Sequence, residues 1–476
     1  MLPTTPLHAL LCRGLPPLVM TSGNRDGEPL AYRRDDSSIR EVADMVVAHD
    51  REVERPIDDS VVRIMSGQVV TIRAARGLAP LDIELPFISY LANRRDAEFE
   101  PPTLLALGTH QKAAIAMARG GRATLGPYVG DLDTEATRVR YVDQLRRLLE
   151  LYGRRPEVIV HDLHPDYFTT RFADSARTHF GDFVDGPRLR TFGVQHHHAH
   201  LAATMAEHRL LDRRVLGIAW DGTGWGPDGT IWGGEFLVTT ATSFQRAARL
   251  RPFRLPGGES AIRSPWRTAF ALVLDVLGDV EAACAVLGGS PQLQLLVPLL
   301  RSGLASPWTS SVGRLFDAIA VLIEAIPVED ANASFEGEFA MHLESLCGGA
   351  TDEPRDEPPY AFPLDESTGE VAEFDWRPLV REILTDRHRG VPAATMARRF
   401  HRALAETIVA MAERYPDLPI VAGGGVFQNR RLVEWLANHR KERGAPFYFP
   451  AQIPPNDGGI SLGQLAVVSA RLAQER

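Results

Sequence analysis

The chain has 476 residues, of which 44% are hydrophobic and 24% charged, the composition of an ordinary globular protein with room for about three domains. Its formal net charge of −9 disfavours binding that depends on neutralising nucleic-acid phosphates. The three cysteines contain no CxxC pair and favour free thiols in a reducing cytosol, and no apolar run reaches the roughly 18–20 residues of a membrane span. The first twenty residues lack a basic start and are interrupted by Arg13, Pro16 and Pro17, so we expect no signal peptide.

The first hundred residues are expected to form part of an α/β domain. A predicted strand, Leu18 to Met20, runs into the polar turn Thr-Ser-Gly-Asn at residues 21–24, whose hydroxyls and N–H groups suit an anion. Apolar residues at helical spacing predict a helix from Asp36 to His49, and a second strand is predicted over Val69 to Arg73. Residues 85–102, which are rich in charge and proline, are expected to be a linker.

A second domain is expected to begin at Thr103. A buried strand enters a turn at Gly108, and a β-hairpin through Gly120 and Gly121 follows, which would place a phosphate near Gly108 and Lys112. An amphipathic helix is predicted over residues 133–152 and a buried strand over residues 158–160. The polar run HDLHPDY at residues 161–167 then follows the end of a strand, where α/β sheets commonly place site residues.

Four of the 15 histidines fall in the block QHHHAH at residues 195–200. His196 and His200 are four positions apart and share one face of a helix, the spacing of an imidazole pair that binds iron or zinc. A predicted strand over residues 215–220 then ends in Asp221-Gly222-Thr223-Gly224, where glycine lets the backbone approach phosphate oxygens and aspartate can hold a metal. Each motif alone is weak, because both patterns are common in ordinary helix ends and turns.

A strand, a glycine turn and a second strand occur twice, near Gly108 and near Gly222, which is the layout of an actin-like ATPase. We therefore expect a first lobe over residues 103–240 and a second over residues 241–476, after an N-terminal domain over residues 1–95. The second lobe is mostly helical to residue 410. It then has a strand, three glycines and a helix start that could face an anion, and Asp457 in a turn before the closing helix.

Seven longer motifs occur in one order over residues 103–476: QHHHAH, DGTGWGPDGTIWGGEF, PGGESAIRSPWR, GRLFDA, FEGEFAMHLE, GGGVFQN and PPNDGGISLGQ. Together they closely resemble the C-terminal domain of the HypF carbamoyltransferases of [NiFe]-hydrogenase maturation, relatives of tRNA threonylcarbamoyl transferases and antibiotic O-carbamoyltransferases. TSGN, RPIDDSVVR and RAARG resemble the C-terminal half of that family's YrdC-like domain. The family's acylphosphatase-like domain, its zinc-finger region and the first YrdC-like half have no counterpart here. Gly423 and Val312 replace a usual serine and alanine.

The resemblance implies an α/β protein with a two-lobed actin-like ATPase fold preceded by a partial YrdC-like α/β domain. It implies that carbamoyl phosphate and ATP yield carbamoyl-adenylate in the YrdC-like domain. The ATPase-like part would then pass the carbamoyl group to the C-terminal cysteine of HypE in the cytoplasm. The implied cofactors are ATP and one divalent metal ion, iron or zinc, and Mg²⁺ could accompany the ATP. No membrane or nucleic-acid partner is expected.

The resemblance also implies site residues, although it assigns no catalytic residue. His197 and His198 are expected to support the metal site rather than to bind metal. The implied metal ligands are His196, His200 and Asp457, with Asp221 as the candidate fourth. The implied nucleotide contacts are Asp317 to the ribose hydroxyls, Gly337, Gly424, Gly425 and Asn429 to adenosine, and Gly108, Lys112, Gly222 and Thr223 near the phosphates. The implied YrdC-like site consists of Ser22, Asn24, Asp59, Ser60, Arg73 and Arg76.

Four alternatives remain at this point, two of them open and two disfavoured. The shared motifs also fit an O-carbamoyltransferase that acts on a small-molecule hydroxyl, or a non-catalytic fragment that binds nucleotide and HypE. A tRNA threonylcarbamoyl transferase is disfavoured by the acidic chain, and a zinc protease by the absence of glutamate beside His196. An incomplete YrdC-like sheet is expected to leave an edge or apolar face uncovered and to be unable to make the adenylate alone.

Overall fold

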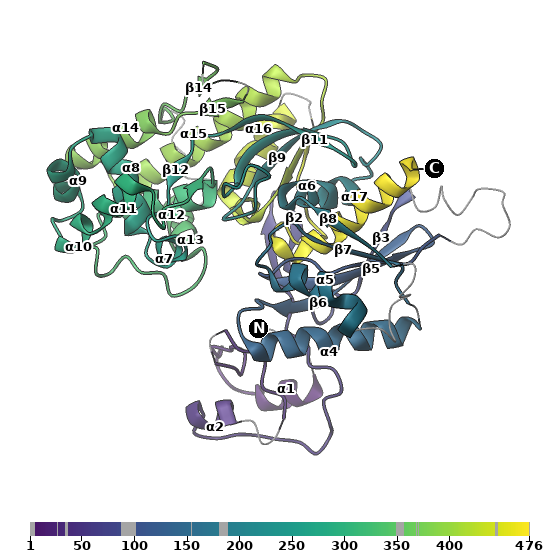
Figure 1. The fold of residues 1–476 in the computed structure, drawn as a ribbon. Coiled ribbons are helices and arrows are strands. Elements are labelled where there is room, and N and C mark those ends of the chain that lie inside the picture. Colours follow the sequence, from purple (N-terminus) through teal and green to yellow (C-terminus); the bar gives the residue numbers. More distant parts are fainter. Residues whose placement is uncertain are drawn as a thin grey trace.

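The computed structural model describes the chain except for residues 1–4, 26, 34–36, 87–100, 154, 180–188, 349–356, 368, 370, 443–445 and 476. The linker expected over residues 85–102 falls mostly outside the described residues. Figure 1 shows two α/β lobes, of which the second carries a large layer of helices. The N-terminal helices lie at the outer side of the first lobe (Figure 1).

The first lobe is built on a six-stranded sheet of order β3-β6-β5-β4-β7-β8. Successive side chains of a strand point to opposite faces. Leu105 and Ile159 therefore pack under helices α4 and α5, whereas Leu104 and Val160 pack against α6 and α17. These elements are β3 (Leu81–Glu84), β4 (Leu104–Ala106), β5 (Ala113–Arg119), β6 (Arg122–Gly130), β7 (Val158–Asp162), β8 (Arg190–Val194), α4 (Glu135–Tyr152), α5 (Phe168–His179), α6 (His196–Glu207) and α17 (Ile460–Gln474).

The second lobe is built on a seven-stranded sheet of order β14-β15-β11-β10-β9-β16-β17. β9 and β16 are parallel neighbours, so their carboxyl ends lie side by side and bring Asp221 close to Gly424. The strands are β9 (Val215–Trp220), β10 (Gly234–Thr239), β11 (Phe244–Leu250), β14 (Leu364–Asp365), β15 (Ala372–Phe374), β16 (Ile420–Gly423) and β17 (Phe447–Tyr448); β12 (Phe253–Arg254) and β13 (Trp308–Thr309) form a separate pair.

The lobe boundary expected after residue 240 lies between β10 and β11, which pair in one sheet. The second lobe therefore begins with β9, because β9 and β10 hydrogen-bond to each other and to its other strands. The chain also returns to the first lobe at its end, since α17 packs against the first sheet.

Helices cover the second sheet, as the sequence predicted for residues 241–410. Aromatic side chains fill the space between helices and sheet, with Trp220 edge-on to Phe236 and Phe316 edge-on to Phe400. The helices are α7 (Glu259–Arg263), α8 (Trp266–Leu277), α9 (Val280–Val286), α10 (Pro291–Gln294), α11 (Leu296–Ser302), α12 (Val312–Glu324), α13 (Glu338–Leu346), α14 (Arg377–His388), α15 (Ala393–Arg414) and α16 (Arg430–Glu442), with 3₁₀ turns η2 (Gly425–Gln428) and η3 (Asp457–Gly459).

Helices α6 and α17 pack closely between the two sheets (Figure 1). Gly463 makes this approach possible, because a Cβ added there would lie 1.8 Å from the carbonyl oxygen of Ala199. The close contact holds the histidine-bearing helix against the helix that follows Asp457. Any larger residue at position 463 would push the two helices apart.

The first sixty residues form little regular structure. The strand predicted over Leu18 to Met20 is absent, and the helix predicted from Asp36 to His49 is only the short α2 (Ser37–Val42), with α1 (Pro6–Leu11) before it. No partner strand among the described residues pairs with Leu18 to Met20, and Val19 is fully exposed. The strand predicted over residues 69–73 is correct. It is β2 (Gln68–Arg73), paired with β1 (Val61–Met65).

None of the helices in the described part of the chain is both long and apolar enough to cross a membrane.

Candidate functional site

Four side chains converge at the interface of the two lobes. His196 and His200 lie one turn apart on α6, which begins where Gln195 accepts a hydrogen bond from the backbone N–H of His198. The Nε2 atoms of both histidines lie 3.2 Å from Asp221 Oδ2, and 3.7 Å and 3.5 Å from Asp457 Oδ1. One ligand atom from each of the four residues lies within 4.8 Å of all the others, and all four residues are buried.

The carboxylate of Asp221 is held in place by the turn that follows β9. Its Oδ1 accepts hydrogen bonds from the backbone N–H groups of Gly222, at 2.8 Å, and Gly425, at 2.9 Å. Its Oδ2 is therefore the oxygen turned toward the two imidazoles. Because these two N–H groups already have an acceptor, they are not free to bind a phosphate.

The electrostatics of this cluster suit a bound cation. Burial alone would lower the pKa of His196 and His200, but Asp457 and Asp221 outweigh it and raise the pKa of both histidines. Asp162 also raises the pKa of His196. The two imidazoles in turn hold the pKa of Asp221 well below its usual range despite its burial. The carboxylates that hold protons on these rings would equally hold a metal ion, and two imidazoles with two carboxylates are ligands that iron and zinc accept.

A third carboxylate lies behind the cluster. Asp162, at the end of β7, accepts a hydrogen bond from Nδ1 of His196 at 2.9 Å, and both side chains are fully buried. Asp162 also accepts the backbone N–H of His164 at 2.9 Å. Such a carboxylate orients a metal-binding imidazole and raises its basicity.

The two middle histidines of the block point elsewhere. Nε2 of His198 donates to the carbonyl of Thr240 at 2.9 Å, and burial lowers the pKa of His198 to about 4. Nδ1 of His197 lies 3.1 Å from the side-chain nitrogen of Gln195, and burial together with the charge on His196 holds the pKa of His197 well below its usual value. Both rings are therefore neutral packing groups in this arrangement.

A cavity of about 670 Å³ extends from Asp221 across both lobes. Among the residues expected at the nucleotide, three that were proposed do not line it. Gly108 is turned inward, where Gln464 accepts its N–H, and a Cβ at Gly424 would lie 2.2 Å from the carbonyl oxygen of Trp220. Thr223 is not among the residues that line the cavity. Those that do line the cavity are Lys112, Gly222, Asp317, Gly337, Gly425 and Asn429.

Asp317 lies on α12, whose first turn is capped by the hydroxyl of Ser311. Its carboxylate is 3.2 Å from the guanidinium of Arg314, one turn earlier. Burial raises the pKa of Asp317 to about 6, although the Arg314 charge opposes this and the Glu336 charge adds to it. Nε of Arg314 is buried without a hydrogen-bond partner among the described residues, so the guanidinium retains a free donor beside the cavity.

A carboxylate lies over the Gly222 turn. Glu336 pairs with Nζ of Lys112, which joins the two lobes, and both residues line the cavity. A Cβ added at Gly222 would lie 3.1 Å from the guanidinium of Arg314 and 3.7 Å from the carboxylate of Glu336. Burial would lower the pKa of Lys112, but the carboxylates of Glu336 and Asp457 raise it above its usual value. Lys112 and Arg314 thus supply positive charge at this end of the cavity.

The strand pair β1–β2 covers the other end of the cavity. Arg63 donates to Glu344 at 3.0 Å and to the carbonyl of Gln428 at 3.0 Å, so it ties the N-terminal region to the second lobe. Ile72 lines the cavity beside it, and its carbonyl accepts the side-chain amide of Asn456. Residues next to the YrdC-like set therefore form one wall of the cavity.

The YrdC-like set itself is only partly assembled. Arg76 donates to Asp59 at 3.0 Å, the hydroxyl of Ser60 accepts the N–H of Ala75, and Arg73 lies over the ring of Tyr128. Ser22 is exposed, and the described contacts of Asn24 are bonds to carbonyls of its own turn, at Arg25 and Glu28. The structure thus groups Asp59, Ser60, Arg73 and Arg76 at the ends of β1 and β2 and leaves Ser22 and Asn24 apart.

Sequence reasoning did not assign four of these residues, although each stands in a motif. Arg314 is one helical turn before Asp317 in GRLFDA, and Glu336 directly precedes Gly337 in FEGEFA. Asp162 lies in HDLHPDY at a strand end, and Arg63 closes RPIDDSVVR. For Arg314 and Glu336 a signal was available, because each is a charged residue close to a predicted ligand contact. Arg314 is one helical turn from its predicted contact, and Glu336 is one position from its own.

Three families match successive parts of the chain. Residues 1–75 match the Sua5, YciO and YrdC family, described as telomere recombination. Residues 99–207 match the HypF Kae1-like domain, and residues 217–464 match the second subdomain of the carbamoyltransferase Kae1-like domain. The division between the last two falls between residues 207 and 217, at the beginning of β9 and of the second sheet.

Curated relatives match over nearly the whole chain. A carbamoyltransferase HypF of Synechocystis sp. is 38% identical over 99% of this chain, and one of Rhodobacter capsulatus is 35% identical over 99%. This chain spans 60% of the length of each of these relatives. A carbamoyltransferase HypF homolog of Cupriavidus necator is 34% identical over 77% of this chain and 91% of its own length.

Two solved structures share the fold. A full-length HypF in the phosphate- and nucleotide-bound form superposes with a TM-score of 0.86 at 33% identity, covering 99% of this chain and 70% of that one. HypF of T. kodakarensis superposes with a TM-score of 0.78 at 27% identity, covering 95% of this chain and 57% of that one. The expected α/β class, a two-lobed actin-like ATPase fold preceded by a YrdC-like domain, is confirmed. The chain belongs to the HypF carbamoyltransferase family.

Proposed function

We propose that the chain transfers a carbamoyl group from carbamoyl-adenylate, made from carbamoyl phosphate and ATP, to the C-terminal cysteine of HypE. The product would supply the cyanide ligands of [NiFe]-hydrogenase in the cytoplasm. One observation carries the proposal: Asp221, a member of the cluster of two histidines and two aspartates, lines a 670 Å³ cavity that is also lined by Lys112, Asp317 and Asn429. This arrangement supports a nucleotide bound in the cavity with its phosphates beside the cluster and its nucleoside at Asp317.

We assign His196, His200, Asp221 and Asp457 as the ligands of one iron or zinc ion, and Mg²⁺ could arrive with the ATP. When bound, such an ion would polarise the carbamoyl carbonyl or neutralise phosphate charge. The chain's own cations, Lys112 and Arg314, would bind the phosphate oxygens, because the N–H groups of Gly222 and Gly425 already donate to Asp221.

Asp317 would accept the ribose hydroxyls, and Gly337 and Asn429 would border the adenosine. Gly108, Gly424 and Thr223 would act by shaping the turns around the cavity rather than by contact. In the transfer step, the cysteine sulfur attacks the carbamoyl carbon and a C–S bond forms. The bond between that carbon and the phosphate oxygen breaks, AMP leaves with the bonding electron pair, and the thiol proton passes to solvent.

The N-terminal region would hold the carbamate side of adenylate formation, through Asp59, Ser60, Arg73 and Arg76 and, once brought near them, Ser22 and Asn24. The described structure supports the first four as one group, because they meet at the ends of β1 and β2. Arg63 and Ile72 form one wall of the cavity between the lobes. This contact supports the view that the N-terminal region and the ATPase-like lobes serve one reaction.

The test is a transfer assay with synthetic carbamoyl-adenylate and purified HypE. We expect AMP release and a carbamoyl group on the C-terminal cysteine, detected by mass spectrometry, and no modification of a HypE variant whose last cysteine is serine. A panel of small-molecule hydroxyl acceptors serves as the second arm. Carbamoylation of that panel with HypE unmodified would favour an O-carbamoyltransferase, and nucleotide binding with no transfer to either would favour a non-catalytic scaffold.

A further inference from the structure

His401 is a buried imidazole in the middle of α15, directly behind the cavity residue Asn429. The rings of Phe400 and Phe316 pack within 6 Å of its centre, and the His401 side chain is buried. A buried polar ring in such surroundings needs a partner for each nitrogen. The identity of those partners determines what the ring can do.

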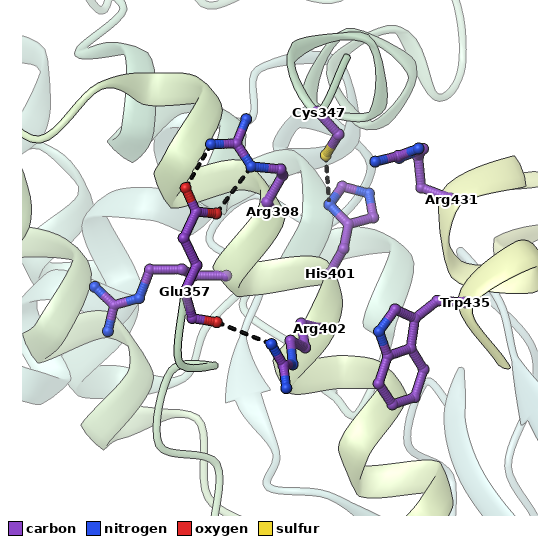
Figure 2. Close-up of a pocket in the computed structure, with 8 residues that line it drawn as sticks. Cys347, Glu357, Arg398, His401, Arg402, Arg431 and Trp435 are labelled. Atoms are coloured by element: carbon purple, nitrogen blue, oxygen red, sulfur yellow. Dashed lines mark hydrogen bonds and ion pairs between the residues drawn. The ribbon is translucent and has the colours of Figure 1, made fainter. Parts of the chain in front are cut away.

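The first nitrogen of His401 has a partner that can only accept. Nδ1 lies 2.8 Å from the carbonyl oxygen of Ala397, so this nitrogen carries a hydrogen. The thiol of Cys347 touches the same nitrogen at 3.3 Å, as Figure 2 shows. On that side lies an arginine-lined cavity, in which Arg398 is bound to Glu357.

The second nitrogen is an acceptor. Burial and the Arg431 charge lower the pKa of His401 to about 4, so the ring is neutral at physiological pH and Nε2 keeps its lone pair. The side-chain nitrogen of Asn429 lies 2.9 Å from Nε2 and must therefore donate to it. His401 thus determines which end of the Asn429 amide faces α15.

The other end of the amide is fixed as well. Oδ1 of Asn429 accepts the backbone N–H of Leu432 at 3.0 Å, at the start of α16. One N–H of the amide remains, and Asn429 lines the 670 Å³ cavity. The amide therefore has a single orientation, in which the unused N–H is the group it can offer to a ligand.

We infer that His401 is a positioning residue for nucleotide binding, which holds the Asn429 amide so that its free N–H donates to an acceptor atom of a bound nucleoside. This inference rests on the proposed function, since it requires a nucleotide in the cavity. Removing the acceptor at position 401 leaves a buried N–H without a partner, and the Leu432 N–H is then the one described contact that opposes rotation of the amide. A flipped amide would present an oxygen to the ligand acceptor and repel it.

The experiment compares three variants of the full chain by calorimetric titration with a non-hydrolysable ATP analogue. His401→Leu removes the acceptor. His401→Gln restores it, because a glutamine oxygen can accept from Asn429 while its nitrogen donates to Ala397. Thr407→Ala is the matched control, because it removes a buried side-chain hydrogen bond on the same helix, to Leu404, away from Asn429. Thermal melts establish that all three variants are folded.

We expect His401→Leu to weaken binding about tenfold, with His401→Gln within about threefold of the unchanged chain and Thr407→Ala unaffected. Equal weakening in the leucine and glutamine variants, or unchanged binding in the leucine variant, would overturn the positioning role and leave the proposed function intact. Failure of the unchanged chain to bind the analogue would overturn the proposed function, and this inference with it.

Discussion

Oδ2 of Asp162 lies 2.9 Å from Nδ1 of His196, and neither side chain is exposed to solvent. A carboxylate only accepts hydrogen bonds, so Nδ1 keeps its hydrogen and Nε2 is the nitrogen turned toward Asp221 and Asp457. Asp162 thereby sets which ring nitrogen would face a metal ion at the proposed site, although it lies on the far side of the ring.

Replacing Asp162 with asparagine should therefore lower metal affinity by about 10–100-fold. An asparagine amide can rotate and donate to Nδ1, which would move the ring hydrogen to Nε2 and block the ligand position. Metal content after dialysis, and competition with a chelator of known affinity, would measure the change. Asp166→Asn is the control, because Asp166 is exposed in the same segment. Equal metal affinity in both variants would contradict this role.

Replacing either His196 or His200 with alanine should abolish both metal binding and carbamoyl transfer, because each histidine supplies one of the two imidazoles in the cluster. His198→Ala should keep both, since the His198 ring points to the Thr240 carbonyl. The comparison uses elemental analysis and the HypE transfer assay on the same preparations. Retained metal in either of the first two variants would invalidate the ligand assignment.

Asp317→Asn should separate stability from binding. Burial raises the folded-state pKa of Asp317 from 3.8 to about 6, so its contribution to folding is full below pH 4 and is lost as the pH rises through 6. At pH 8 the buried charge should cost about 2–3 kcal/mol, which asparagine avoids. Urea unfolding should show the variant more stable at pH 8 and equal to the unchanged chain near pH 4.

The same variant should bind nucleotide more weakly, because asparagine is a poorer acceptor for ribose hydroxyls than a carboxylate. Asp330→Asn, at an exposed position, provides the control for both measurements. A variant that loses stability at pH 8 would show that Arg314 compensates the Asp317 charge more fully than the folded-state pKa indicates.

Local spacing predicted that His196 and His200 share one helix face, whereas Asp457 came only from the family resemblance and contacts between the lobes could not be predicted at all. His196 and His200 are brought together by one helical turn, and Asp221 follows a strand that was evident from its apolar run. The pairing of Lys112 with Glu336 depends on how the lobes meet, which no local pattern encodes. Arg314 could be placed on a helix but not over the Gly222 turn, for the same reason.

Strand predictions failed where a tertiary partner was required. Leu18 to Met20 has strand composition, yet among the described residues it has no neighbour to pair with and remains outside any sheet. β-propensity reflects packing on a pleated surface rather than a backbone preference, so composition alone was insufficient. The lobe boundary predicted after residue 240 also depended on a tertiary contact. It falls between β10 and β11, and their pairing in one sheet is not evident from the sequence.

Lys112→Met should weaken ATP binding roughly tenfold to a hundredfold while leaving adenosine binding nearly unchanged. Lys112 lines the cavity beside Asp221 and the Gly222 turn, and its ammonium already pairs with a carboxylate there, as it would with phosphate. Calorimetric titration with ATP and with adenosine measures the difference directly. Equal losses for both ligands would place Lys112 in fold maintenance instead of phosphate binding.

On its own, the 476-residue chain should use supplied carbamoyl-adenylate but should not make it from carbamoyl phosphate and ATP, because no described contact holds Ser22 and Asn24 near the other YrdC-like residues. Ser22 and Asn24 are not joined to Asp59, Ser60, Arg73 and Arg76 by any described contact, and Leu10, Val19 and Met45 leave large apolar side chains exposed nearby in the sequence. An adenylate-forming site needs those groups held together.

Two parallel assays decide this. Pyrophosphate release from carbamoyl phosphate and ATP should stay at background, while AMP release from synthetic carbamoyl-adenylate should depend on HypE. The His200→Ala variant controls the second assay, since it removes a proposed ligand without touching the N-terminal region. Sustained pyrophosphate release by this chain alone would mean that Asp59, Ser60, Arg73 and Arg76 suffice for adenylate formation, and that Ser22 and Asn24 are dispensable.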